Sequence, residues 1–487
     1  MYCSDTRINQ AGPAMFRSIS LALFVVSTLN SFATAEDAKR PNIVLILADD
    51  LGYETLGCDG GESYKTPNLD ALAAAGVRFD RCYVQPLCTP TRVGLMTGMS
   101  NARNYIEFGA MDPNATTFGN LLKQVGYATA MAGKWQLGRD KDLPQKVGFD
   151  ETCLWQHTRI PPRYANPGPE YNGTPRDFKN GEYGPDLVSD FALGFVEKNR
   201  SKQFFLYYPM MLTNAPYQPP PDSADYDPKA HGEKVHHDNK HFGDMVAYMD
   251  KLVGKVVTKL DDLKLRDNTL ILFLGDNGTG RGITSQLRGV SYTGGKGLTN
   301  ARGMHVPIIA NSPGHIKAGT VNDDLIDSTD FLPSVCAAAG AKVPSNLKID
   351  GQSFWPQLMG ETGQPREWIY TWYAQNGISP RYEFVTTKDH KLYRDGKFFD
   401  LKQDPYEEGA PKNAADLKGD EAKTAAKLQA VLDQYADARP AEFVADVGAL
   451  PEAVARTVRA DDVVIVMGAG SIGELPQQLV QMSGGAA

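Results

Sequence analysis

The stretch CTPTRVGLMTG, residues 88–98, places a cysteine ahead of a proline two positions on and an arginine four positions on. The apolar and glycine residues that follow predict a tightly packed helix. The chain has six cysteines, which are Cys3, Cys58, Cys82, Cys88, Cys153 and Cys336. Their spacing includes no CxxC pair and no Cys/His cluster, so a structural zinc site is not indicated. Cys88 therefore needs another chemical explanation.

Two pairs of oxygen-bearing side chains each follow an apolar run. Asp49 and Asp50 end the run NIVLILADD, and Asp276 and Asn277 follow TLILFLG. Four hard oxygen ligands without a histidine suit calcium, or alternatively magnesium, better than a soft metal. Because Asp at a strand end is also a common turn or helix cap, the two pairs predict a metal site only if their strands are neighbours.

Three basic residues are candidates for binding an anion. Arg92 belongs to the cysteine motif, Lys134 lies in AGKWQLG, and Lys296 lies in TGGKGL. The glycines allow close approach of the backbone to a ligand and free each lysine to point inward. The alternative for any single lysine is an ordinary solvated surface position.

The elements that must position these residues are buried strands that alternate with helices. Continuous apolar runs predict strands buried on both faces, and they are NIVLILA, YATAMAG, QFFLYYPM, TLILFLG and HVPIIANSP. Helical patterns such as TPNLDALAAAG and DMVAYMDKLVGKVVTKLDDL separate them. This alternation predicts an α/β fold with a large mixed, mostly parallel sheet sandwiched by helices. Ligands bind beyond the carboxyl ends of the strands in such sheets, where Asp49, Lys134 and Asp276 are expected.

The pattern changes along the chain and predicts two folded parts. Residues 36–340 carry the α/β pattern and are expected to form the large domain that holds the candidate residues. Two long Pro-, Gly- and Tyr-rich stretches, which begin at residues 159 and 216, predict surface loops that wall the substrate pocket. Residues 341–440 carry short strand candidates and a helix near 419–437, which predict a small antiparallel sheet with a helix packed on it.

The first residues predict an export signal. Arg17 precedes ISLALFVVSTL, which is too short to span a bilayer, and the triplet ATA before Glu36 has the form of a signal peptidase site. A buried helix is the alternative. We expect residues 1–35 to be cleaved, which leaves an odd number of cysteines and a periplasmic or extracellular protein without a stable membrane anchor.

The charge of the chain argues against one class of partner. The sequence has 50 Lys+Arg and 58 Asp+Glu residues in 487, a net charge of -8, and no basic run. This balance would repel a nucleic acid backbone. We therefore expect no nucleic acid partner.

A series of motifs between about residues 40 and 440 matches one known family. The stretch CTPTRVGLMTG resembles a Cys-x-Pro-x-Arg signature followed by Thr-Gly. The stretches PNIVLILADDLGY, GYATAMAGKWQLG, LGDNG, GGKG, DGQSFWPQLMG and FFDLKQDPYEE resemble the further landmarks, in the expected order. These motifs are similar to those of the type I sulfatases, which are formylglycine-dependent, arylsulfatase-like members of the alkaline phosphatase superfamily.

The resemblance implies that a separate maturation enzyme oxidises Cys88 to formylglycine. The hydrate of this aldehyde offers one hydroxyl that attacks sulfur and a second that, once deprotonated, expels sulfate and restores the aldehyde. The resemblance also implies a calcium ion that polarises the sulfate. Its ligands would be the modified Cys88 together with Asp49, Asp50, Asp276 and Asn277.

The same resemblance implies roles for the basic residues and shows two departures. Arg92 would hold the modified side chain, and Lys134 and Lys296 would contact the sulfate and stabilise its growing charge. Gln136 and Tyr217 stand where the family usually has histidines, so they would bind substrate but transfer protons poorly near neutral pH. Histidines that could substitute are His157, His236, His237 and His315.

The implied function is hydrolysis of a sulfuric ester, either a sulfated carbohydrate or an aryl sulfate. Two alternatives stay open. The first is a sulfatase-like protein with weak or no turnover that binds sulfated glycans, which Gln136 and Tyr217 favour. The second is a phosphoester hydrolase of the same superfamily, although such enzymes tend to use a Ser or Thr nucleophile and histidine metal ligands.

The last segment, residues 441–487, continues past the sulfatase pattern. It contains Gly468-x-Gly470-x-x-Gly473 after an apolar run, but only 14 residues follow Gly473, too few for a dinucleotide-binding βαβ unit. Residues 442–480 resemble the end of UDP-N-acetylmuramate alanine ligase, a Mur ligase. No P-loop or central ligase domain precedes them, so we expect this tail to be non-functional.

Overall fold

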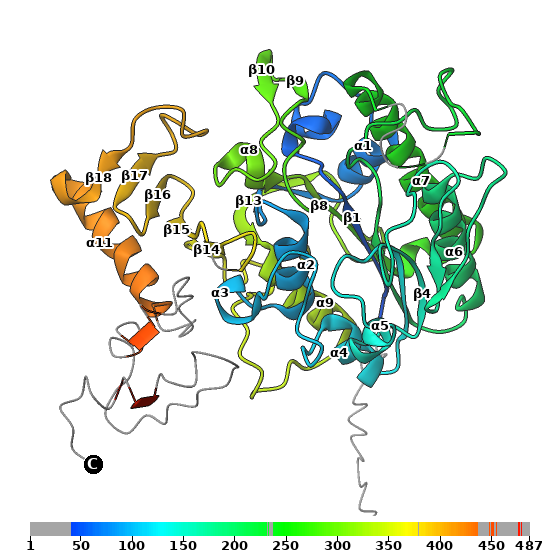
Figure 1. Cartoon of the computed structure of the whole chain (residues 1–487), viewed down its shortest axis with the longest axis horizontal. Coiled ribbons are helices and arrows are strands. Elements are labelled where there is room, and N and C mark those ends of the chain that lie inside the picture. Colours follow the sequence, from blue (N-terminus) through cyan, green and yellow to red (C-terminus); the bar gives the residue numbers. More distant parts are fainter. Residues whose placement is uncertain are drawn as a thin grey trace, which may run out of the picture. The chain divides into compact units, whose positions relative to one another are not determined.

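The computed structural model describes residues 40–230, 232, 237–377 and 379–436, together with seven isolated positions between 448 and 479 (Figure 1). The predicted signal peptide and nearly all of the ligase-like tail lie outside the described residues. No helix within the described ranges is long and apolar enough to cross a membrane.

One large sheet forms the centre of the molecule. Its strand order is β11-β2-β12-β8-β1-β7-β3-β4-β5-β6, and β13 also pairs with β2. The strands are β1 (Asn42–Ala48), β2 (Val77–Tyr83), β3 (Ala128–Lys134), β4 (Glu151–Trp155), β5 (Glu170–Tyr171), β6 (Thr174–Pro175), β7 (Phe204–Pro209), β8 (Thr269–Gly275), β11 (His305–Val306), β12 (Ile308–Asn311) and β13 (Thr320–Asp327). A separate hairpin joins β9 (Thr284–Leu287) and β10 (Val290–Thr293).

The centre of the sheet is parallel and its margins are mixed. Strand β1 pairs in parallel with β7 and β8, and β3 pairs in parallel with β7 and β4. Strand β12 is antiparallel to both β8 and β2, and β5 is antiparallel to β4. The large mixed, mostly parallel sheet predicted from the apolar runs is therefore confirmed.

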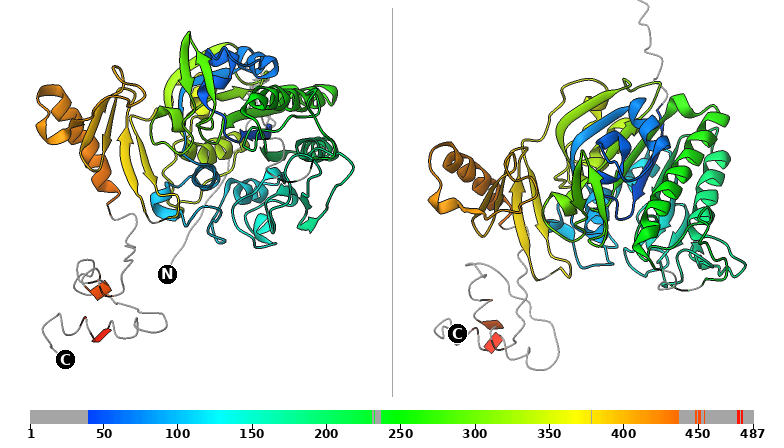
Figure 2. Two further views of the ribbon diagram at one scale, coloured as in Figure 1. Left: turned by 45° about the horizontal axis from the view of Figure 1, so that its top comes forward. Right: turned by 90° about the horizontal axis from the view of Figure 1, so that it is seen from above.

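Helices cover both faces of the sheet, as predicted. Along the described chain the helices are α1 (Pro67–Ala74), α2 (Cys88–Thr97), α3 (Asn101–Asn104), α4 (Phe118–Gln124), α5 (Leu143–Lys146), α6 (Gly184–Lys198), α7 (Phe242–Asp262), α8 (Ala301–Met304), α9 (Phe331–Ala339), α10 (Trp355–Leu358) and α11 (Gly419–Gln434), of which α11 packs on the C-terminal sheet instead. Successive residues of β1 face opposite sides. Ile43 and Leu45 pack in the core that includes α2, α4 and α9, whereas Val44 and Ile46 pack in the core that includes α1, α6 and α7. Helices α6 and α7 lie side by side (Figures 1 and 2).

The C-terminal part is a five-stranded antiparallel sheet with one helix packed on it, as predicted. Its strands, in spatial order, are β14 (Ile369–Tyr373), β15 (Tyr382–Thr386), β16 (His390–Tyr393), β17 (Lys397–Asp400) and β18 (Lys412–Asn413). Helix α11 contacts β15 and β16. Val385 and Leu428 of this part belong to the same core cluster as Ile43 of β1, so the two sheets share apolar packing. The boundary at residue 340 stays a prediction.

Candidate active site

Two acidic strand ends meet at the middle of the large sheet. Strands β1 and β8 are neighbours, with Ala48 opposite Gly275. This register places Asp49 and Asp50 beside Asp276 and Asn277. The amide of Asp50 donates to Asp276 Oδ1 at 3.0 Å, and Asn277 Nδ2 donates to Asp50 Oδ1 at 2.9 Å. The sequence predicted a metal site only if these two strands were neighbours, and they are.

Each of the three acids in this group is paired with a predicted cation. Lys134, at the end of β3, donates to both carboxylate oxygens of Asp49 at 2.8 and 2.9 Å. Arg92 Nη2 lies 3.0 Å from Asp276 Oδ2, and Lys296 Nζ lies 2.5 Å from Asp50 Oδ2. Arg92 and Lys134 are buried, whereas the Lys296 side chain is 27% exposed. Lys296 is therefore the cation that solvent can reach.

Cys88 lies at the centre of this charged group. It is the first residue of α2, which follows β2 after a short loop, and it is buried. Its Sγ donates to Gln136 Oε1 at 3.0 Å, just beyond the end of β3. We call the ten predicted residues the Cys88 cluster; they are Asp49, Asp50, Cys88, Arg92, Lys134, Gln136, Tyr217, Asp276, Asn277 and Lys296. The structure brings all of them together at one edge of the sheet.

The cluster fits a hard divalent cation. Ligand atoms of Asp49, Cys88 and Asp276 lie within 4.8 Å of one another, and all three residues are buried. Asn277 Oδ1 is also buried and has no hydrogen-bond partner among the described residues. A buried amide oxygen without a partner beside several carboxylates is a donor set that suits calcium or magnesium.

Burial and neighbouring charges shift the pKa values of the carboxyl groups of Asp49 and Asp276. Burial, followed by the negative charge of Asp49, raises the pKa of Asp276 above its usual range. Burial opposes ionisation of Asp49 as well, but the charges of Lys134 and Arg92 outweigh it and lower the pKa of Asp49. A bound cation would relieve the repulsion between the two groups.

Burial raises the pKa of the Cys88 thiol, although the positive charge of Lys134 acts in the opposite direction. The side chain is therefore a neutral thiol near pH 7 rather than a thiolate. Since the thiolate is the nucleophilic form of cysteine, the unmodified residue is a weak nucleophile in this position.

Gln136 and Tyr217, the two departures from the family pattern, both lie in the cluster. Gln136 has a positive φ of 52° and contacts Cys88 directly. Tyr217 is buried, and burial together with the negative charge of Asp50 raises its pKa. A β-carbon at Gly280 would lie 2.2 Å from the Tyr217 hydroxyl, so a glycine is required there to admit the ring.

The four alternative histidines fall into three groups. His157 is buried and lines a cavity with Gln136, and His237 Nδ1 accepts a hydrogen bond from the Tyr217 amide at 2.8 Å. His315 follows Gly314, which lies against the backbone of Asp267 before β8, so it lies at the opposite edge of the sheet. His236 lies outside the described residues.

Two residues near Asp49 were not predicted from the sequence. Asn214, in the loop after β7, donates to Asp49 Oδ1 at 3.2 Å. Arg163 Nη1 lies 3.7 Å from Asp49 Oδ2, and its guanidinium lies 4.1 Å from the centroid of the Trp155 ring. The strand-end argument would have found Asn214, because it follows the predicted strand QFFLYYPM. Arg163 lies in an irregular loop and had no such signal.

A cavity of about 420 Å³ opens beside Gln136. It is lined by residues 107–110 and 156–157, by Ile160, and by Gly138 and Arg139 of the loop after β3. Arg139 is exposed, and it places a positive charge close to the cluster.

Known proteins resemble this chain in sequence and in fold. The family model described as Sulfatase matches residues 41–341, and the model described as N-sulphoglucosamine sulphohydrolase, C-terminal, matches residues 295–436. Arylsulfatase A of Homo sapiens is 33% identical over 381 residues, which are 68% of this chain and 70% of the relative. N-acetylgalactosamine-6-sulfatase of Mus musculus is 34% identical over 373 residues, 69% of each chain.

Solved structures with the same fold include Ps i-CgsB in complex with k-i-k-neocarrahexaose. Its TM-score is 0.70 at 26% identity, and the match covers 87% of this chain and 98% of that one. A protein in complex with its substrate D-glucosamine-2-N,6-O-disulfate has a TM-score of 0.67 at 23% identity, covering 82% and 98% of the two chains. The matches to the family model and to the two curated relatives show that the chain belongs to the sulfatase family.

Proposed function

We propose that this protein hydrolyses a sulfuric ester at the Cys88 cluster, with a formylglycine made from Cys88 and a calcium ion. The observation that carries the proposal is the position of Cys88. It begins α2 inside a buried group of three acids and three cations, and its Sγ touches Gln136. A maturation enzyme that reads the Cys-x-Pro-x-Arg context would supply the modified side chain.

The two absent groups would supply the chemistry that the unmodified chain lacks. Formylglycine would provide, as its hydrate, a hydroxyl nucleophile for sulfur, and calcium would polarise the sulfate and lower the pKa of that hydroxyl. The residues that would hold calcium are Asp49, Asp50, Asp276 and Asn277, together with the modified residue 88.

The cations of the chain would bind and stabilise the sulfate. The charges of Lys134 and Lys296 both act on the Cys88 side chain, and so they would act on a sulfate held there. Arg92 donates from Nη1 to the Lys134 carbonyl at 2.8 Å and pairs with Asp276, so its guanidinium is fixed in position behind residue 88. Fixed charge costs no reorganisation as the transition state forms.

Proton transfer to the leaving oxygen is the weakest part of the site. Gln136 cannot transfer a proton near neutral pH, and Tyr217 has a raised pKa. His157 lines a cavity with Gln136 and His237 contacts Tyr217, and we propose that one of the two serves as the acid. The same departures favour a second candidate function, which is tight binding of a sulfated glycan with slow turnover.

The proposed substrate is a sulfated sugar, and the proposed location is outside the cytoplasm. Support comes from the carbohydrate bound in Ps i-CgsB and from the sugar named in N-acetylgalactosamine-6-sulfatase. The cavity beside Gln136 has room for more than the sulfate group itself. Amino-terminal sequencing of protein from a periplasmic extract would test cleavage after Ala35.

The first experiment is mass spectrometry of the tryptic peptide from Cys82 to Arg92, prepared from protein produced with a formylglycine-generating enzyme. We expect an aldehyde or its hydrate at Cys88. Sulfate release from an aryl sulfate and from a monosaccharide sulfate is then followed in calcium and in chelator. We expect the Cys88→Ala variant to be inactive and the Cys336→Ala variant, a second buried cysteine, to keep activity. An unmodified thiol despite an active maturation system would contradict the proposal.

A further inference from the structure

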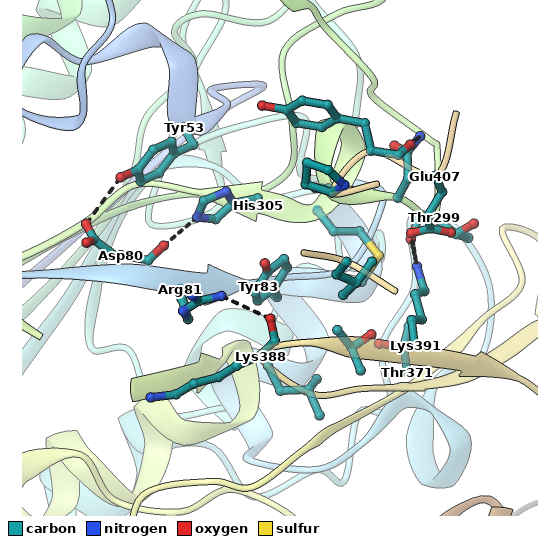
Figure 3. Close-up of a pocket in the computed structure, with 18 of the residues that line it drawn as sticks. Tyr53, Asp80, Arg81, Tyr83, Thr299, His305, Thr371, Lys388, Lys391 and Glu407 are labelled. Atoms are coloured by element: carbon teal, nitrogen blue, oxygen red, sulfur yellow. Dashed lines mark hydrogen bonds and ion pairs between the residues drawn. The ribbon is translucent and has the colours of Figure 1, made fainter. Parts of the chain in front are cut away.

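A second cavity, of about 290 Å³, lies between the large sheet and the C-terminal sheet (Figure 3). Its lining comes from β2 and β11 on one side, from β14, β15 and β16 on the other, and from the residues around α8. None of the ten residues of the Cys88 cluster lines it. Figure 3 shows Arg81, Tyr83, His305 and Thr371 around this space.

One wall of the cavity is a stack of three rings. Tyr53 and His305 stack with centroids 4.1 Å apart, and His305 and Tyr83 stack at 5.1 Å. Burial lowers the pKa of His305 to about 4, and the charges of Arg81 and Arg288 act in the same direction. The neutral imidazole holds its proton on Nε2, which donates to the Asp80 carbonyl at 2.9 Å. Its Nδ1 is therefore a hydrogen-bond acceptor.

Among the charged side chains of the lining, the guanidinium groups of Arg81 and Arg288 have no carboxylate partner within the described residues. Most of the others are paired with one another or with a neighbour, namely Lys391 with Glu407, Lys388 with Asp323, and Asp80 with Arg78. Arg81 donates to the Lys388 carbonyl, and Arg288 donates to the Tyr53 hydroxyl and the Asp59 carbonyl. Within the described part of the chain, neither guanidinium forms a salt bridge with a carboxylate. The lining has four cations and three carboxylates, a net charge of +1, so the two guanidiniums are the groups with which an anion would pair.

Three polar atoms of the lining are buried and lack a hydrogen-bond partner among the described residues. They are Arg81 Nε, Asn300 Oδ1 and Thr371 Oγ1. Thr371 is only 1% exposed, so its hydroxyl has lost its contact with bulk water. A buried polar atom without a partner is costly, and a polar ligand in this cavity would give a partner to all three atoms.

We propose that this cavity is a second binding site, separate from the Cys88 cluster, for a single anionic sugar unit. Arg81 and Arg288 bind its sulfate or carboxylate group. Asn300 Oδ1, Thr371 Oγ1 and His305 Nδ1 pair with its hydroxyls. The volume lies at the lower end of the range for ligand pockets, which fits one ring with a charged substituent and excludes a longer chain as the sole occupant of the cavity.

Binding is tested without turnover, so that its failure differs from failure of the proposed hydrolysis. The probe is N-acetylglucosamine 6-sulfate, titrated by calorimetry into the Cys88→Ala protein. The variants are Arg81→Gln with Arg288→Gln, and Thr371→Val, and the matched control is Arg200→Gln, an exposed arginine two residues after the end of α6. Inorganic sulfate and unsulfated N-acetylglucosamine are titrated alongside.

We expect the double arginine variant to lose affinity at the second site by about 10- to 100-fold and the control to lose none. Thr371→Val should lose about 2- to 10-fold in affinity while unfolding at the same or a higher urea concentration than its parent, because it removes an unpaired buried hydroxyl. A structural role alone would lower stability and leave affinity unchanged. Unchanged affinity in both variants, or equal affinity for inorganic sulfate, would overturn the proposal.

The ligand could come from a free sugar or from one unit of a long glycan, and the wild-type enzyme distinguishes them. If the site holds part of a polymer, the double arginine variant should lower kcat/KM for a sulfated polysaccharide and leave that for the monosaccharide sulfate unchanged. If it holds free sugar, the variant should instead change the effect of added N-acetylglucosamine 6-sulfate on aryl sulfate hydrolysis. Absence of both effects, together with absence of binding, would exclude the site.

Discussion

Each carboxylate of the Cys88 cluster is held by a specific cation. The pair of Lys134 and Asp49 is buried and bidentate, and Asn214 and Arg163 also lie near the Asp49 carboxylate. Removing one partner of such a pair leaves a charge that water cannot reach. The cations therefore serve the fold as well as the chemistry.

Replacement of Lys134 by methionine should lower the free energy of unfolding by about 3 kcal/mol or more, because Asp49 is left buried without its main partner. Urea denaturation in calcium-free buffer measures the change. The matched control is Lys397→Met, which breaks the exposed pair of Lys397 with Asp395 and should cost less than about 1 kcal/mol. Equal losses in the two variants would contradict this account.

Replacement of Gln136 by histidine should raise kcat by about 100-fold, since it restores a proton-transfer group next to residue 88. The backbone at this position has a positive φ, which histidine and asparagine adopt more readily than most residues. The pH profile of kcat should gain a limb near the ordinary pKa of histidine, about 6.5. Gln136→Asn is the control, and it should show neither the rise in kcat nor the new limb in the pH profile. Equal rates in both variants would show that another residue already transfers the proton.

Residue types at strand ends were predictable from the sequence, but their partners were not. Asp49, Lys134 and Asp276 could be predicted because each of them directly follows a continuous apolar run in the sequence. Arg163 could not, because it reaches Asp49 from a long irregular loop whose path depends on tertiary contacts. The pairing of each acid with one cation likewise depends on strand order, which no local pattern contains.

At the scale of the element, strand β3 depends on a close approach to β7. Gly133 has a φ of 128°, and a β-carbon there would lie 1.8 Å from the Pro209 carbonyl oxygen. Lys134 follows directly, so this approach determines where its side chain starts. Only glycine combines the backbone conformation with the absence of a side chain.

Gly133→Ala should therefore destabilise the protein by about 3 kcal/mol or more, from backbone strain and overlap together. Gly194→Ala in α6 should do the opposite and stabilise by up to about 1 kcal/mol, because nothing lies within 4 Å of the added carbon and alanine favours the helix. Thermal unfolding of both variants separates the two effects. A stabilising Gly133→Ala would refute the geometry at β3.

Long elements were easier to predict than short ones. The helix expected from DMVAYMDKLVGKVVTKLDDL is α7, Phe242–Asp262, and the apolar runs became β1, β3, β7 and β8. HVPIIANSP became two short strands, β11 and β12, because Pro307 has no N–H to donate between them. The two-residue strands β5 and β6 show no periodicity at all, so only pairing in space defines them.

At the scale of the whole molecule, buried acids make stability depend on pH. The carboxyl group of Glu54 is buried, and burial raises its pKa to about 7, although hydrogen bonding to Thr279 acts in the opposite direction. The unfolded chain releases this proton near pH 4.5, whereas the folded chain keeps it until about pH 7. The folded state therefore loses stability as the pH rises between these values.

Glu54→Gln should remove this loss. We expect the variant and the wild type to have similar free energies of unfolding at pH 4.5 and the variant to be more stable by roughly 3 kcal/mol at pH 8. Urea denaturation at the two pH values measures the difference. If the variant and the wild type differed in free energy of unfolding by the same amount at both pH values, the substitution would act through packing rather than through protonation of Glu54.

The burial of α2 has a consequence for how the active protein is made. All ten residues of this helix, Cys88 included, are buried. An oxidising enzyme could not bind this segment once the chain has folded. On the proposed chemistry, Cys88 must therefore be modified before the chain folds. Every chain then has a single opportunity, and one that folds with its thiol intact stays inert. The specific activity of a preparation would thus depend on the rate of modification relative to the rate of folding.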